Sequence, residues 1–142
     1  MKYLFPVFFM LFTAATFTSC SKDDGKPEKM NSSLIVGRWQ LDYEEVTYEG
    51  ETKVYTEDPV TATIVTFYED GEIIVDSSSD DGREIDKGTY KLSADGKYLT
   101  IDQIGEEDEG TFSVDKLTSE LMTLSITYSS NEHVVSTFKK IK

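Results

Sequence analysis

The chain has 142 residues, of which 38% are hydrophobic and 12% aromatic, enough for one packed domain and too few for two of ordinary size. Its formal net charge of −13 argues against nucleic acid or anionic lipid headgroups as partners, because both are bound through basic surfaces. A single cysteine excludes any disulfide within the chain.

The N-terminal residues have the parts of a secretory signal peptide. Lys2 provides a short positive start, and residues 3–17 form an apolar stretch. A membrane-spanning helix needs about 20 apolar residues. This stretch is shorter, and Pro6 interrupts it. We therefore predict that residues 1–19 are a signal peptide that is removed.

The residues before the cysteine, Phe17-Thr18-Ser19-Cys20, resemble the lipobox of bacterial lipoproteins. In that motif the cysteine becomes the acylated N-terminus after cleavage, so the resemblance implies that Cys20 is a lipidation site that anchors the protein to a membrane. An ordinary signal peptide that ends beside a free cysteine is the alternative.

The residues after Cys20 are expected to be a tether. Ser21-Lys22-Asp23-Asp24 resembles the export signal of surface lipoproteins in Gram-negative bacteria, which implies an outer-membrane protein exposed on the cell surface. Residues 20–33 are mostly polar and contain Gly25 and Pro27, so they are predicted to be flexible.

From residue 34 onward, alternating apolar residues predict β-strands rather than helices. The alternation changes phase at residues 44–45, which predicts a bulge or bend in a long first strand. The residues expected on the inner face of this strand are Trp39, Leu41, Tyr43, Val46 and Tyr48.

Turn residues divide the rest of the chain into hairpins. Asp70-Gly71 and Asp95-Gly96 each stand between two β-rich runs, which is a strong hairpin signal. Short connections and about eight strands predict an all-β, antiparallel up-and-down barrel over residues 34–142. A β-sandwich is the rival architecture, but a closed barrel leaves no unpaired edges.

A resemblance supports the barrel. The motifs Gly37-x-Trp39, Phe67-x-x-Asp70-Gly71, Gly88-x-Tyr90 and Phe138-Lys139-Lys140 resemble those of lipocalin-like domains in small lipoproteins of Gram-negative bacteria. The resemblance covers residues 34–142. It implies that Trp39 closes the narrow end of the barrel, and that Lys139 or Lys140 packs over the Trp39 ring, where lipocalins usually have Arg.

No motif in the sequence predicts catalysis. His133 is the only histidine, and its phase differs from that of Val134, Ser136 and Phe138, so it is expected to be an exposed strand residue. No Gly-x-Ser-x-Gly motif accompanies it, and no His pair or zinc motif occurs. We therefore predict a non-enzymatic protein with no catalytic residues, no metal site and no cofactor.

Two acidic stretches, at residues 76–86 and 105–110, are candidate cation sites. Residues 76–86 have the oxygen-rich composition that calcium prefers, but their spacing does not fit an EF-hand loop. Placing Gly82 at the loop's glycine puts Gly88 where a bidentate Glu belongs. We predict solvated loops here and at residues 105–110.

Two functions remain open. The leading hypothesis is a membrane-anchored surface lipoprotein whose barrel mouth binds a small hydrophobic ligand. The candidate ligand-binding residues are Trp39, Tyr43, Val65, Phe67, Tyr90, Phe112 and Ile126. The alternative is a structural or accessory module with a filled barrel, which binds a protein or glycan through its loops or its outer face. The exposed tyrosines that are candidates for such contacts are Tyr48, Tyr55 and Tyr68.

Overall fold

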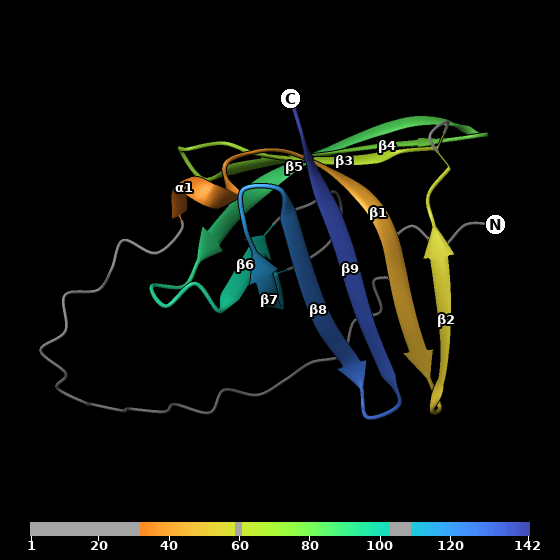
Figure 1. Cartoon of the computed structure of the whole chain (residues 1–142). Helices are drawn as coiled ribbons and strands as arrows, with labels where there is room; N and C mark the ends of the chain where they lie inside the picture. The colour runs from red at the N-terminus through yellow and green to blue at the C-terminus, as the bar shows by residue number, and fades with distance from the viewer. Residues whose placement is uncertain (1–31, 59–60, 103–108) are drawn as a thin grey trace, which may run out of the picture.

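Nine strands and one short helix make up the part of the chain that the computed structural model describes, residues 32–58, 61–102 and 109–142 (Figure 1). The elements are α1 (Ser32–Ile35), β1 (Gly37–Tyr48), β2 (Glu51–Thr56), β3 (Thr63–Phe67), β4 (Glu72–Ser79), β5 (Gly82–Leu92), β6 (Tyr98–Asp102), β7 (Gly110–Leu117), β8 (Leu121–Ser129) and β9 (Glu132–Ile141). The predicted signal peptide, Cys20 and most of the tether lie outside the described residues, as does most of the predicted loop at residues 105–110. None of the described helices is long and apolar enough to cross a membrane.

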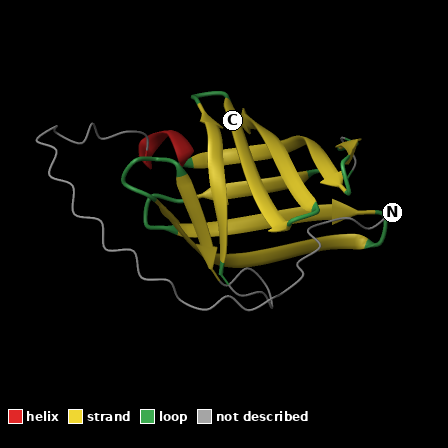
Figure 2. Cartoon of the chain, turned by 90° about the horizontal axis from the view of Figure 1, so that it is seen from below, coloured by secondary structure: helices red, strands yellow, loops and turns green. Residues whose placement is uncertain are grey.

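The strands form a closed antiparallel barrel, as predicted. Strands β3 to β9 pair in chain order, and β1 closes the ring by pairing with both β3 and β9. The two walls of the barrel cross in Figure 2. The strand β2 is an additional strand that the alternation pattern did not predict. All its residues are exposed, so its sequence does not need an apolar face. It pairs with the part of β1 beyond β3.

A bulge in β1 changes which residues face the interior. The register against β9 shifts between Leu41 and Tyr43, so Asp42 is the extra residue. Tyr43 pairs with Thr137, the neighbour of the inward-facing Phe138, and therefore points outward. The prediction that Tyr43 shares the inner face with Trp39 was wrong, because the bulge comes before Tyr43 rather than after it. Glu44 takes the inner face instead.

The narrow end of the barrel is closed around Trp39, as the resemblance implied. The Trp39 side chain is fully buried, and its Nε1–H donates a hydrogen bond to the carbonyl oxygen of Ile35 at 2.7 Å. The Nζ of Lys140 lies 4.8 Å from the Trp39 ring centroid and donates to the Leu34 carbonyl at 2.8 Å. Lys140, rather than Lys139, is therefore the cation over the ring.

Gly37 makes this close packing possible. Its φ is +128°, and a Cβ at this position would lie 2.8 Å from Cε of Lys140. Any side chain would displace the lysine from the Trp39 ring. The helix α1 also belongs to this end: it begins at Ser32, within the predicted tether, and buries Ile35 completely.

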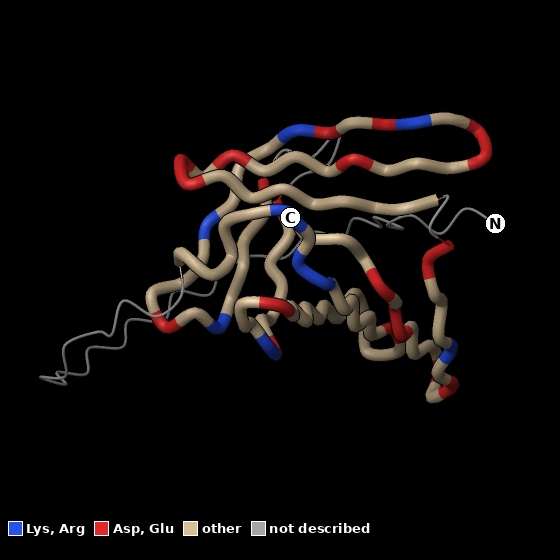
Figure 3. The backbone as a smooth tube through the Cα atoms, turned by 45° about the horizontal axis from the view of Figure 1, so that its top comes forward, with Lys and Arg blue, Asp and Glu red and all other residues tan. Residues whose placement is uncertain are grey.

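The core fills the half of the barrel next to α1. Its buried hydrophobic residues are Ile35, Trp39, Leu41, Val65, Phe67, Ile73, Val75, Leu99, Met122, Leu124 and Phe138. We predicted a loop for the acidic stretch at residues 76–86, and this prediction was wrong. The stretch forms the end of a long hairpin. Ser77 of β4 pairs with Glu84 of β5, and the strands are joined at Asp80 and Asp81. Acidic positions occur along the strands and at the hairpin tips around the barrel rather than in one patch (Figure 3).

Candidate functional site

The end of the barrel away from α1 is not filled. The β1–β2 and β8–β9 turns meet there, where the Glu49 amide donates to the Asn131 carbonyl at 2.9 Å (Figure 1). Inside this end lies a pocket of about 390 Å³. Seven of its twelve lining residues are aliphatic or aromatic. The pocket is therefore a concave, mainly apolar site with a few polar groups, the usual form of a small-molecule site.

Cross-strand register sorts the pocket lining into layers between the core and the rim. Glu44 pairs with Tyr55 and Ser136 in the layer next to the core residue Leu41. The middle layer is mostly aliphatic and contains Lys53, Val46, Val134 and Ile126. The rim layer contains Glu51, Tyr48 and Glu132. Phe112 from β7 and Tyr128 from β8 complete the lining.

Glu44 is the ionisable group deepest in the pocket. Its Oε1 accepts a hydrogen bond from the Ser136 hydroxyl at 2.7 Å. Burial raises the pKa of the Glu44 carboxyl, while the Ser136 hydrogen bond opposes this and the charge of Glu57 adds to it. Among the described residues, no ion pair balances the Glu44 carboxylate. The pocket thus holds an acid that is partly desolvated and lacks a counter-charge.

Glu57 holds the junction between β2 and β3. Its two carboxylate oxygens accept hydrogen bonds from the Thr63 amide at 2.6 Å and the Thr63 hydroxyl at 2.7 Å. Thr63 is almost completely buried. Burial raises the pKa of Glu57, and the two hydrogen bonds from Thr63 oppose that rise. Glu57 is therefore a structural acid whose charge acts on Glu44.

The structure places the seven candidate ligand-binding residues in three different environments. Phe112 and Ile126 line the pocket. Three others, namely Trp39, Val65 and Phe67, are buried in the packed core.

The last two candidates lie at the edge of the core and on the outer face, respectively. Tyr90 packs edge-on against Phe67, with ring centroids 4.9 Å apart, and its hydroxyl donates to the Tyr68 carbonyl at 2.7 Å. Tyr43 faces outward. Five of the seven are thus not brought to the pocket. Tyr43 is turned outward by the bulge, and the other four belong to the filled half of the barrel, which alternation cannot distinguish from the open half.

Sequence reasoning missed several pocket residues, above all Glu44. The predicted phase change at residues 44–45 lies beyond the observed bulge at Asp42, and this error assigned Glu44 to the outer face and Tyr43 to the inner face. Tyr48 and Tyr55 are exposed, as expected, and they also line the open pocket, which the sequence did not indicate. Tyr68 is exposed. The useful signal was present in the sequence, because the inner-face run that ends in Val46 and Tyr48 has Glu44 in phase with it.

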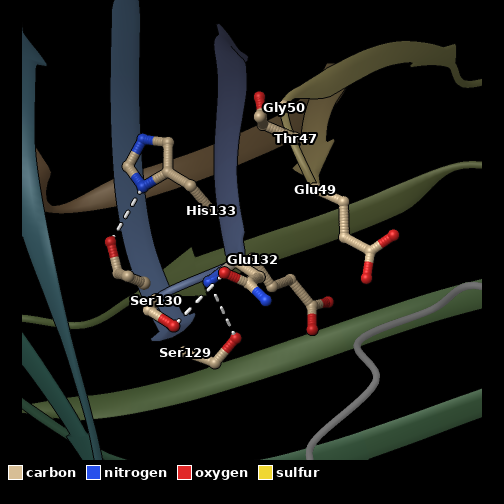
Figure 4. Close-up of a pocket in the computed structure, with 9 residues that line it drawn as sticks. Thr47, Glu49, Gly50, Ser129, Ser130, Glu132 and His133 are labelled. Atoms are coloured by element: carbon tan, nitrogen blue, oxygen red, sulfur yellow. Dashed lines mark hydrogen bonds between the residues drawn. The ribbon is translucent and has the colours of Figure 1, made fainter.

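A second hollow, of about 510 Å³, lies on the outside of the rim (Figure 4). It is wide open and polar, with Thr47, Ser129 and His133 on its walls. His133 is exposed, as its phase predicted, and its Nδ1 shares a hydrogen bond of 2.9 Å with the Thr127 hydroxyl. This hollow lacks the apolar enclosure of the pocket. In the described part of the chain, no three His, Cys, Asp or Glu side chains are grouped so that they could hold a metal ion.

Comparison with known proteins supports the architecture. No family model matches the sequence, and no curated protein matches it either. Among solved structures, the chain is similar to a lipocalin-like protein from Bacteroides uniformis ATCC 8492, with a TM-score of 0.58 and 20% sequence identity. The match covers 76% of this chain and 99% of the other. The domain described here therefore has a lipocalin-like fold.

Proposed function

We propose that this protein is a non-enzymatic binding protein whose barrel holds one small, largely apolar molecule in the pocket at its open end. The observation that carries the proposal is the unfilled space of about 390 Å³ above a packed core. Sites for drug-sized ligands start at about 300 Å³. An eight-stranded barrel is near the size at which its interior is either filled or holds one small ligand.

The half-filled interior favours this function over a filled scaffold. A cluster of buried side chains, among them Trp39 and Phe138, packs the narrow end. In the open half, the inward-facing positions carry medium-sized residues such as Val46 and Val134, which leave the centre empty. An apolar ligand would bury its surface against these walls and gain about 25 cal/mol for each Å² removed from water.

We also propose that the protein is anchored in the outer membrane by acyl chains on Cys20 and is exposed on the cell surface. The lipobox-like sequence before Cys20 and the Lys-Asp-Asp sequence after it support this location. Each buried methylene adds about 0.8 kcal/mol of membrane affinity, so two or three chains hold such a protein durably. The barrel is then free to bind its ligand without contacting the membrane. The net charge of −13 argues against nucleic acid as a partner.

The pocket can be tested by filling it. Val46→Trp adds a large side chain to the middle layer, whereas Thr47→Trp adds the same side chain to the outer surface one residue away. We expect saturable calorimetric binding of fatty acids, alcohols or amines to the wild type and to Thr47→Trp, and its loss in folded Val46→Trp. Binding that is equal in the two variants would place the ligand outside the pocket.

A further inference from the structure

We propose that the ligand is an amphiphile with a protonated amine head group, which enters the pocket head-first and binds the Glu44 carboxylate. This inference rests on the proposed function and adds the chemical class of the ligand. Three features of the pocket carry it: the position of Glu44, the balance of charge around Glu44, and the aromatic walls.

Glu44 lies where the head group of a ligand would end. It is the first inward-facing residue of β1 beyond Leu41, so the packed core lies directly beneath it. Ser136 donates to one of its oxygens, and no other hydrogen bond to the Glu44 carboxylate is found among the described residues. The remaining acceptor positions of the carboxylate are open to a donor arriving through the pocket. An ammonium group has three N–H donors and no acceptor, which matches an acceptor-only carboxylate.

The charge around the pocket selects a cation. Glu57 is close enough for its charge to act on Glu44, and the rim carries Glu51 and Glu132. Lys53 is the only basic residue in the lining, and it is exposed and forms no ion pair with the described residues. An anionic head group would meet three or four carboxylates there, whereas an ammonium group would neutralise one of them.

The walls suit the rest of such a ligand. Tyr55 is the cross-strand neighbour of Glu44, so an ammonium group at the carboxylate lies beside an aromatic ring. Cations are attracted to the faces of aromatic rings within about 6 Å. Above this layer, Val46, Ile126 and Phe112 provide an apolar passage for a hydrocarbon body. The polar base and apolar middle together fit an amphiphile rather than a small soluble amine.

The test compares three ligands that differ only in the head group: decylamine, decanol and decanoate, each titrated into the full mature protein near neutral pH and below its micellar concentration. We expect decylamine to bind about tenfold or more tightly than decanol, because a hydrogen bond to a charged partner contributes more than a neutral one. Decanoate should bind most weakly. This comparison uses the wild-type protein and does not depend on how any variant folds.

A matched pair of variants locates the head group. Glu44→Gln and Glu45→Gln each remove one negative charge, the first at the base of the pocket and the second on the opposite, outer face of the same strand. We expect Glu44→Gln to weaken decylamine binding by about tenfold or more and to change decanol binding by less than about twofold. Glu45→Gln should change decylamine binding by less than about threefold, as expected for a charge that lies outside the pocket.

The possible results separate the two proposals. Similar affinities for all three ligands, or equal effects of the two variants on decylamine, would overturn the head-group assignment and leave the apolar pocket standing. Tighter binding of decanol or decanoate than of decylamine would also overturn it. Absence of binding by all three ligands would overturn the head-group assignment together with the proposed function.

Discussion

Replacing Trp39 by Ala tests how the narrow end of the barrel is held. The Trp39 side chain is fully buried and belongs to the packed core, so its truncation leaves a cavity there. Truncating a buried Trp to Ala costs about 3 to 5 kcal/mol. The substitution also leaves the Ile35 carbonyl without its 2.7 Å donor, which favours the upper part of that range.

A second variant measures how much the cation above the ring contributes to stability, separately from the ring itself. Lys140→Met keeps a long apolar stem and removes the charge that lies 4.8 Å from the Trp39 centroid and bonds the Leu34 carbonyl. A partly desolvated cation–π contact contributes about 1 to 2 kcal/mol, and a hydrogen bond from a charged donor a comparable amount. We therefore expect Lys140→Met to cost about 1 to 3 kcal/mol, less than Trp39→Ala.

Urea unfolding followed by far-UV circular dichroism measures both costs. The slope of the unfolding free energy against urea should not change, so the loss should show as a lower midpoint. A loss below about 1 kcal/mol for Trp39→Ala would refute the argument, since it would mean that the closed end does not depend on the buried ring.

Three further predictions follow from other parts of the chain. Glu44 has a raised pKa in the folded protein, so its contribution to stability should fall as pH rises from 4.5 through that folded value. Glu44→Gln should therefore gain stability relative to the wild type at neutral pH, and melting curves should lose this difference below pH 4.5; a Gln variant that is less stable at neutral pH would contradict the shift. Gly37→Ala should cost about 1 to 3 kcal/mol in the same urea assay, because its φ is positive and its Cβ would displace Lys140; an unchanged midpoint would contradict this. Cys20→Ala should leave the domain folded but move it from the membrane fraction to the soluble fraction, and a variant that stays with the membrane would refute the lipid anchor.

The sequence predicted the closed end of the barrel well because that end depends on local constraints. Gly37-x-Trp39 combines a backbone that only glycine adopts easily with a ring that must be covered. Asp70-Gly71 fixes a turn by the same requirement, with Gly71 at a φ of 90°. Each of these features is determined by a few neighbouring residues and can be inferred without the rest of the fold.

The open end was harder to predict because its features depend on distant partners. The position of the bulge at Asp42 is set by pairing with β9, almost a hundred residues later, and the local alternation fits either side of it. The strand β2 has no buried residue and exists because the end of β1 needs a partner there. The volume of the pocket depends on how far side chains from five strands extend into the barrel. The alternation of apolar and polar residues predicts which side chains face inward, but not how much space they leave.

The central claim is that the pocket at the open end of the barrel holds one small molecule, and a native mass spectrum of protein isolated from its own cells tests it most directly. We predict a mass above that of the bare mature chain by one small ligand, present in Thr47→Trp and absent from folded Val46→Trp, which fills the pocket. A bare mass in freshly isolated wild-type protein, or the same added mass in both variants, would contradict the claim.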